Sequence, residues 1–94
     1  MFKRNDAVSI DSTSYHGVEI TASLKTLVRL FSTPVCGGDK TKHEWILEGE
    51  TFNVAVYDYR YNGAYEGHWH VGSATKAESL EFARWFRSVV SSGA

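Results

Sequence analysis

The sequence predicts an α+β protein in which an antiparallel β-meander sheet packs against two α-helices on one face. Two turn signals, Gly49-Glu50 and Asn62-Gly63, separate three extended runs, and Asn-Gly is the strongest short hairpin signal. Segments with apolar residues at helical spacing, about 22–32 and 76–90, flank these runs. Because one sheet face alone is apolar, we expect both helices on that face and an open face opposite.

The residues before the first helix suit short extended segments. The apolar run from Ala7 to Ile10 fits a short strand. Val18 and Ile20 alternate with other residue types, which fits a second short strand or the approach to a helix. Thr21 is the predicted N-cap of the first helix. The apolar stripe of that helix is Leu24, Leu27, Val28 and Phe31.

Two-residue turns at both signals define a register for the three strands. This register pairs Trp45 with Val54 and Tyr57 with His68. Side chains alternate between the two faces of a strand, so the register divides them into two sets. The set expected on the core face is Trp45, Leu47, Phe52, Val54, Val56, Trp69 and Val71. The set expected on the open face is Lys42, Glu44, Ile46, Asn53, Ala55, Tyr57, Tyr59, Glu66, His68 and His70.

The last predicted element begins with a clear helix start signal. Thr75 and Glu78 have the spacing of a capping box, in which two side chains bond the free backbone amides of the first turn. The apolar residues that follow form a wide arc on one side of the helix. This arc contains Leu80, Phe82, Ala83, Phe86, Val89 and Val90.

Composition and charge narrow the class of protein. A chain of 94 residues, 43% hydrophobic with one proline, is expected to form a single domain over residues 1–94. The net charge of −1 gives no basic surface for nucleic acid. Neither a secretory signal nor the ~20 apolar residues of a membrane span are seen. One cysteine, Cys36, allows no internal disulfide, so a cytoplasmic location is expected.

Candidate catalytic and metal-binding residues form no complete site in the sequence. His68 and His70 share one predicted strand face, and the predicted register brings Glu44 near His70 above the small Ala55, as a metal site would need. A solvated strand face explains the same pattern, and we expect no metal and no cofactor.

Three further residues have side chains of the kind that take part in catalysis. His43 and Asp58 alternate onto the core side, and no nucleophile accompanies them. Cys36 lies in a loop after a helix, without a base to lower its pKa. We therefore expect no catalytic residue and no enzyme.

Tyrosines on the second hairpin are the strongest feature outside the predicted core. Tyrosine offers a large contact area at a low entropy cost and is enriched in interfaces. Five acids and one base lie between Glu44 and Glu66, so we interpret the hairpin as a mildly acidic partner-binding surface. The strand propensity of tyrosine is the alternative explanation. The predicted partner-binding residues are Tyr57, Tyr59, Tyr61, Tyr65, His68, His70 and Glu44.

Three stretches, 40–47 (KTKHEWIL), 56–59 (VYDY) and 69–72 (WHVG), lie within a segment that makes up about a third of the chain. They resemble small bacteriophage proteins of unassigned function, in which a loop leads to Glu-Trp, then to a Tyr-Asp strand and a Trp-His-Ile-Gly strand. Residues 53–57 and the final helix with Trp85 and Phe86 are also similar to small anti-CRISPR proteins. The resemblance implies a phage accessory protein made in an infected bacterium, and it carries over no catalytic residue.

The expected function is that of a phage-type interaction protein that binds and inhibits or modulates a host protein. An anti-CRISPR or other anti-defence role in the bacterial cytoplasm fits this expectation. The alternative is a small-ligand or nucleotide-binding module that uses the open sheet face. The expected partner is a host protein or protein complex, and a second copy of the chain is a further candidate. Direct binding to nucleic acid or to a membrane is not expected.

Overall fold

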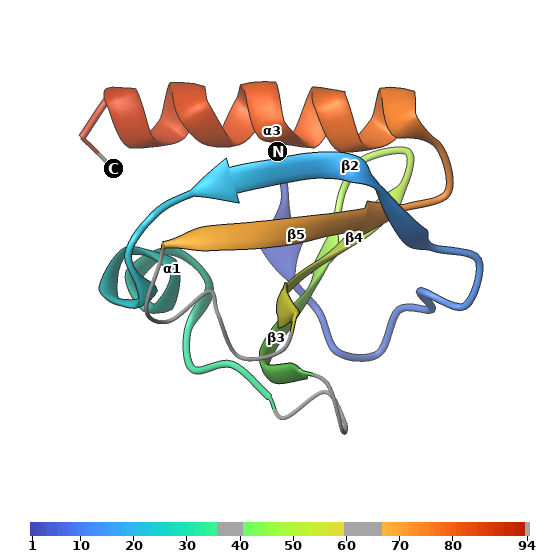
Figure 1. Ribbon diagram of the computed structural model, residues 1–94, viewed down its shortest axis with the longest axis horizontal. Helices are drawn as coiled ribbons and strands as arrows, with labels where there is room; N and C mark the ends of the chain where they lie inside the picture. Colours follow the sequence, from blue (N-terminus) through green and yellow to red (C-terminus); the bar gives the residue numbers. More distant parts are fainter. Residues whose placement is uncertain (36–40, 60–66, 94) are drawn as a thin grey trace.

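The computed structural model describes residues 1–35, 41–59 and 67–93 and has the predicted α+β fold (Figure 1). Within these residues, five strands form one antiparallel sheet in the order β1-β3-β4-β5-β2. The strands are β1 (Lys3–Arg4), β2 (Ser14–Thr21), β3 (Thr41–Glu48), β4 (Asn53–Tyr59) and β5 (His68–Ser73). The helices are α1 (Leu24–Phe31) and α3 (Lys76–Ser91). The three predicted strands thus form the centre of the sheet, and the N-terminal strands form its edges.

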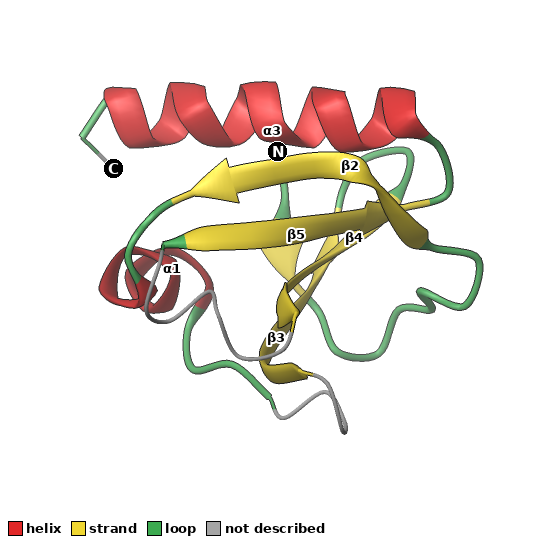
Figure 2. Cartoon of the chain, viewed as in Figure 1, coloured by secondary structure: helices red, strands yellow, loops and turns green. Residues whose placement is uncertain are grey.

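One face of the sheet carries the hydrophobic core, as the alternation of side chains predicted. The helix α3 lies along β2 and β5 (Figure 2). The rings of Phe31 in α1 and Phe86 in α3 have centroids 6.4 Å apart, so the two helices meet over the same face. The buried core consists of Phe2, Val18, Ile20, Leu27, Phe31, Trp45, Leu47, Val54, Val56, Trp69, Val71, Phe82, Ala83 and Phe86.

Two buried tryptophans hold α1 against the sheet at both of its ends. The indole N–H of Trp69 donates to the carbonyl of Ala22, just before the helix, at 2.8 Å. The indole N–H of Trp45 donates to the carbonyl of Ser32, just after the helix, also at 2.8 Å. Burying an indole N–H without a partner is unfavourable. These two bonds therefore satisfy the rings and determine where α1 lies.

The helix starts correct one prediction and confirm another. Ser23 is the N-cap of α1 and accepts a backbone N–H of the first turn, whereas the predicted cap, Thr21, belongs to β2. The N-cap of α3 is Thr75, as predicted, and its hydroxyl accepts the backbone N–H of Glu78 at 3.2 Å. The Glu78 carboxylate in turn accepts the N–H of Ala74 at 3.3 Å.

The register of the first hairpin differs from the prediction by two residues. Trp45 lies opposite Val56 instead of the predicted Val54. The backbone N–H of Gly49 donates to the carbonyl of Phe52 at 2.9 Å, which places the two turn residues at 50–51 instead of 49–50. Gly49 therefore pairs with Phe52 at the end of the hairpin, and it is not the first of the two turn residues as predicted.

The second hairpin is displaced by two residues in the same direction. Tyr57 lies opposite His70 instead of the predicted His68, while the turn signal at 62–63 lies outside the described residues. Because side chains alternate with a period of two, a displacement of two leaves each one on its predicted face. For the side chains that the structure describes, the predicted faces are therefore right although the predicted partners are wrong; those of Lys42, Tyr59 and Glu66 lie outside them.

The segment between β1 and β2 crosses part of the face that was expected to be open. Residues 7–10 lie outside any strand, contrary to the prediction, and the first strand forms at residues 3–4 instead. The segment must pass from one sheet edge to the other. On the way, the Asn5 amide donates to the Glu48 carboxylate and the Asn53 amide donates to the Ser9 carbonyl, each at 3.3 Å. The face opposite the helices is therefore covered at this end.

The predicted apolar arc of the last helix is wider than the face that is buried. Leu80 and Val90 are exposed on α3, while Phe82, Ala83 and Phe86 enter the core.

Of the helices in the described part of the chain, none has the length and hydrophobicity that a membrane crossing requires.

Replacing Phe86 by alanine tests the assignment of the core. The ring is 1% exposed and packs against Phe31 and Phe82, so Phe86→Ala should lower the free energy of unfolding by about 3–5 kcal/mol. The matched control is Leu80→Ala on the outer side of the same helix, which should change it by less than about 0.5 kcal/mol. Urea denaturation followed by tryptophan fluorescence measures both values. Similar effects of the two substitutions would contradict the assignment.

Candidate functional site

A row of four directly opposed residues crosses the sheet on the face opposite the helices. Glu44 on β3 lies opposite Tyr57 on β4, and Tyr57 lies opposite His70 on β5. His70 in turn lies opposite Glu19 on the edge strand β2. Opposed residues on adjacent strands have Cβ atoms about 4.5–5.5 Å apart. The four side chains, which we call the polar row, therefore form a continuous line with a carboxylate at each end.

Tyr15 joins the polar row from the start of β2. Its ring stacks on His70, with centroids 3.9 Å apart and planes 12° apart. Its hydroxyl donates to the Glu19 carboxylate at 2.9 Å. Tyr15 and Glu19 are four residues apart but oppose residues that are two apart, because β2 bulges between them. Gly17 lies in this bulge with a φ of 83°, a conformation that glycine adopts without steric cost.

Glu19 connects the two residues that pack beside it. Its Oε2 accepts the Tyr15 hydroxyl and lies 3.5 Å from Nε2 of His70. Burial lowers the pKa of His70, and the Glu19 carboxylate opposes this shift. Burial and the hydrogen bond to Glu19 raise the pKa of Tyr15. The Glu19 end of the row is thus a bonded group that ties the edge strand β2 to β5.

Glu44, at the other end of the row, has a different environment. Its side chain is half-buried, and burial raises the pKa of its carboxyl group. The backbone of Glu44 forms an isolated bridge with Val35. Among the described residues, no hydrogen-bonding or ion-pair partner meets its carboxylate. The polar row therefore has a bonded carboxylate at one end and, at the other, a carboxylate that no described side chain pairs with.

The structure brings together part of the set that the sequence predicted. Glu44, Tyr57 and His70 belong to the polar row. His68 is exposed beside it, with its Nδ1 3.4 Å from the hydroxyl of Thr21. The side chains of Tyr59, Tyr61 and Tyr65 lie outside those that the structure describes.

Sequence reasoning missed Tyr15 and Glu19, which complete the site. The alternation of Val18 and Ile20 fitted a strand or the approach to a helix and did not indicate a neighbouring strand, because β2 pairs with a strand about fifty residues further along the chain. Glu19 lies between those two buried residues and so had to face the other side of that strand.

The predicted route to a metal site is wrong in its geometry. Tyr57, and not Ala55, lies between Glu44 and His70. The carboxylate that reaches His70 is that of Glu19. Within the described residues, no group of three or more His, Cys, Asp or Glu is arranged to hold a metal ion.

A second polar pair, His43 and Asp58, lies on the core side of the sheet, as the alternation predicted. Asp58 is fully buried, and its carboxylate accepts the backbone N–H of His43 at 2.8 Å. Its other oxygen lies 2.6 Å from Nδ1 of His43. A register shift between Thr41 and Glu44 places two residues of β3 opposite Asp58. We assign the pair a structural role, because the carboxylate closes this bulge by bonding both the backbone and the ring.

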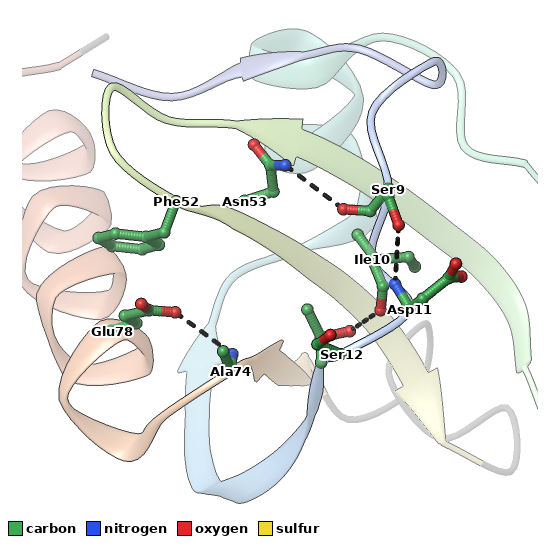
Figure 3. A pocket seen from close by; sticks show the side chains of 9 residues that line it. Ser9, Ile10, Asp11, Ser12, Phe52, Asn53, Ala74 and Glu78 are labelled. Atoms are coloured by element: carbon green, nitrogen blue, oxygen red, sulfur yellow. Dashed lines mark hydrogen bonds between the residues drawn. The ribbon is translucent and has the colours of Figure 1, made fainter.

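A shallow hollow of about 300 Å³ lies between residues 9–13 and the start of α3 (Figure 3). Its polar groups bond to each other: the hydroxyl of Ser9 accepts the N–H of Asp11, and Glu78 accepts the N–H of Ala74. These bonds shape the segment and the helix start. The residues that line the hollow do not include any member of the polar row.

No family model matches the chain, and comparisons with curated proteins and with solved structures find no match. The resemblance to bacteriophage proteins therefore stays a prediction.

The titration of His70 tests the electrostatics of the row. Burial disfavours the charged imidazolium, so His70 should titrate below its ordinary value of 6.5. Glu19→Gln removes a carboxylate that favours the charged form, so the pKa of His70 should fall further. The pH dependence of the imidazole NMR signals measures both values. A higher pKa in the variant would contradict the assigned role of Glu19.

The same shift predicts the direction of one stability change. Between the folded and unfolded pKa values of His70, the unfolded chain binds more protons. The contribution of His70 to the free energy of unfolding is therefore complete above 6.5 and decreases as the pH falls through the folded value. The pKa of Glu44 shifts in the opposite direction and also affects the pH dependence of stability. Comparing the thermal unfolding of His70→Gln with that of wild type over a range of pH isolates the contribution of His70.

Proposed function

We propose that the chain is an interaction protein that binds another protein through the polar row and thereby inhibits or modulates it. One observation carries the proposal: carboxylate and aromatic side chains line up on a face that neither described helix covers. Tyr15 is 41% exposed at this site. Tyrosine is enriched in interfaces because it gives a large contact area with few rotatable bonds.

Contacts within the row support the proposal, because they hold its side chains in place before a partner arrives. Tyr15 is fixed by its stacking on His70 and by its hydrogen bond to Glu19. Tyr57 meets the other side of His70 with ring centroids 5.6 Å apart. Side chains that are already ordered lose less conformational entropy on binding. Such a surface favours affinity for a partner of matching shape.

The charge of the row favours a partner that presents a basic segment. A carboxylate stands at each end, and no Lys or Arg among the described residues forms an ion pair with Glu19 or Glu44. A cation over a tyrosine ring gains about 0.5–2 kcal/mol, depending on its desolvation. An arginine or lysine side chain of the partner would therefore meet both complementary charge and aromatic surface.

A host protein is the partner that the resemblance to bacteriophage proteins implies, and an anti-defence role would follow from it. The alternative of a small-ligand or nucleotide-binding module has less support. The hollow of Figure 3 is lined by residues 9–13, 52–53, 74 and 78, and by no residue of the polar row. If a second copy of the chain bound through its own polar row, carboxylates would meet carboxylates, which is unfavourable. A homodimer would therefore need a different, basic surface of the second copy.

Titration with charged peptides tests the proposal. A peptide of alternating arginine and serine is added to isotope-labelled protein, and a glutamate–serine peptide of equal length serves as the matched control. The arginine peptide should shift amide NMR signals around Tyr57 and His70, and added salt should weaken its binding. Equal responses to the two peptides, or shifts confined to other surfaces, would contradict the proposal.

Affinity capture from a bacterial lysate then identifies the natural partner. A captured protein supports the proposal when Tyr15→Ala reduces the capture and Leu80→Ala, on the outer side of α3, does not. Capture that is insensitive to Tyr15→Ala would place the binding surface elsewhere.

A further inference from the structure

We infer that Glu44, with Tyr57 beside it, binds one cationic side chain of the partner, the guanidinium of an arginine or the ammonium of a lysine. The inference rests on the proposed function and names the point of the polar row at which the charge of the partner is held. It follows from the different environments of the two carboxylates in the row.

Glu19 is occupied by contacts within the protein. Its Oε2 accepts the hydroxyl of Tyr15 and lies 3.5 Å from Nε2 of His70. A cation that bound Oε2 of Glu19 would compete with both contacts, and these contacts fasten the edge strand β2 to its neighbour. Glu19 therefore acts as a positioning residue that keeps Tyr15 and His70 in the row.

Glu44 has no such contacts among the described side chains. It is half-buried between two strand-like neighbours, with Tyr57 opposite it on β4 and the backbone of Val35 on its other side. Partial burial removes water from the carboxylate and gives no hydrogen bond in return, which is unfavourable. A cation placed there would relieve this cost, and its attraction to the carboxylate is stronger than it would be in bulk water.

Tyr57 selects the kind of group that fits beside Glu44. Tyr57 is the aromatic residue of the row that lies directly opposite Glu44 in the strand pairing. An ammonium or guanidinium group gains from contact with a tyrosine ring. A neutral polar group gains neither this contact nor the charge attraction. The pair of a carboxylate and an aromatic ring therefore specifies a cation.

The effect of Glu44 on stability gives a test that needs no ligand. Burial raises the pKa of Glu44 above 4.5, so ionisation of this group destabilises the free protein. This destabilisation begins as the pH rises through 4.5 and is complete above the folded value. Glu44→Gln should therefore raise the melting temperature at neutral pH and have little effect under more acidic conditions. Glu19→Gln should lower it, because it weakens the bond to Tyr15.

The binding test uses the arginine–serine peptide and its citrulline–serine counterpart, in which each guanidinium is replaced by a neutral group of the same shape. Glu44→Gln should weaken binding of the arginine peptide about tenfold, which corresponds to about 1.4 kcal/mol. Glu81→Gln on the exposed side of α3 is the matched control and should leave the affinity unchanged. The citrulline peptide should bind weakly to wild type, and Glu44→Gln should not weaken it further.

The outcomes separate this inference from the proposed function. If the arginine peptide binds the row of Glu44→Gln as tightly as it binds that of wild type, the role of Glu44 is wrong and the docking function stands. If the peptide does not bind the row of the wild-type protein, both are wrong. A lysine–serine peptide with the same dependence on Glu44 would support an ammonium as well as a guanidinium ligand.

Discussion

The indole hydrogen bonds of two buried tryptophans determine how the rest of the structure is arranged. Trp45 and Trp69 lie on the strands at either side of β4, with ring centroids 5.3 Å apart and planes at 75°. Each donates to a backbone carbonyl next to one end of α1. Since an unpaired indole N–H in the core is unfavourable, α1 is held over this face. The alternate side chains of the same strands are thereby left on the other face.

The polar row depends on this division of the sheet. Its members project from four adjacent strands whose opposite sides are packed into the core, so their backbones are held by tertiary contacts. Side chains on such strands keep a more precise geometry than side chains on loops. Glu19 and Tyr15 then fix one end of the row. At the other end no described side chain pairs with the carboxylate of Glu44, and we propose that a cation binds there. In the function that we propose, support and recognition are provided by different residues of one row.

Local sequence patterns predicted the face on which each side chain lies. They did not predict which strands pair over long distances or in which register. Alternation placed Tyr57 and His70 on the open face, because a face depends on residue type at every second position. The partners across the first hairpin were wrong by two residues, since it closes between Gly49 and Phe52 instead of Glu48 and Thr51. Glu19 was missed because it reaches His70 through a strand pairing that no local pattern encodes. The face of Asp58 was predictable, whereas its bond to His43 depends on a bulge.

Val56 and Tyr57 are neighbours on β4 that face opposite sides of the sheet. Together they test most directly whether one face supports the fold and the other binds a partner. Val56 is fully buried in the core. Val56→Ala should lower the free energy of unfolding by about 1.5–3 kcal/mol and leave the affinity of the folded protein for the arginine–serine peptide unchanged. Tyr57→Ala should weaken that binding about 30-fold, as expected for an aromatic anchor worth about 2 kcal/mol, with a smaller loss of stability. The reverse pattern, or equal effects of both substitutions on binding, would contradict the division of the sheet into a supporting face and a recognition face.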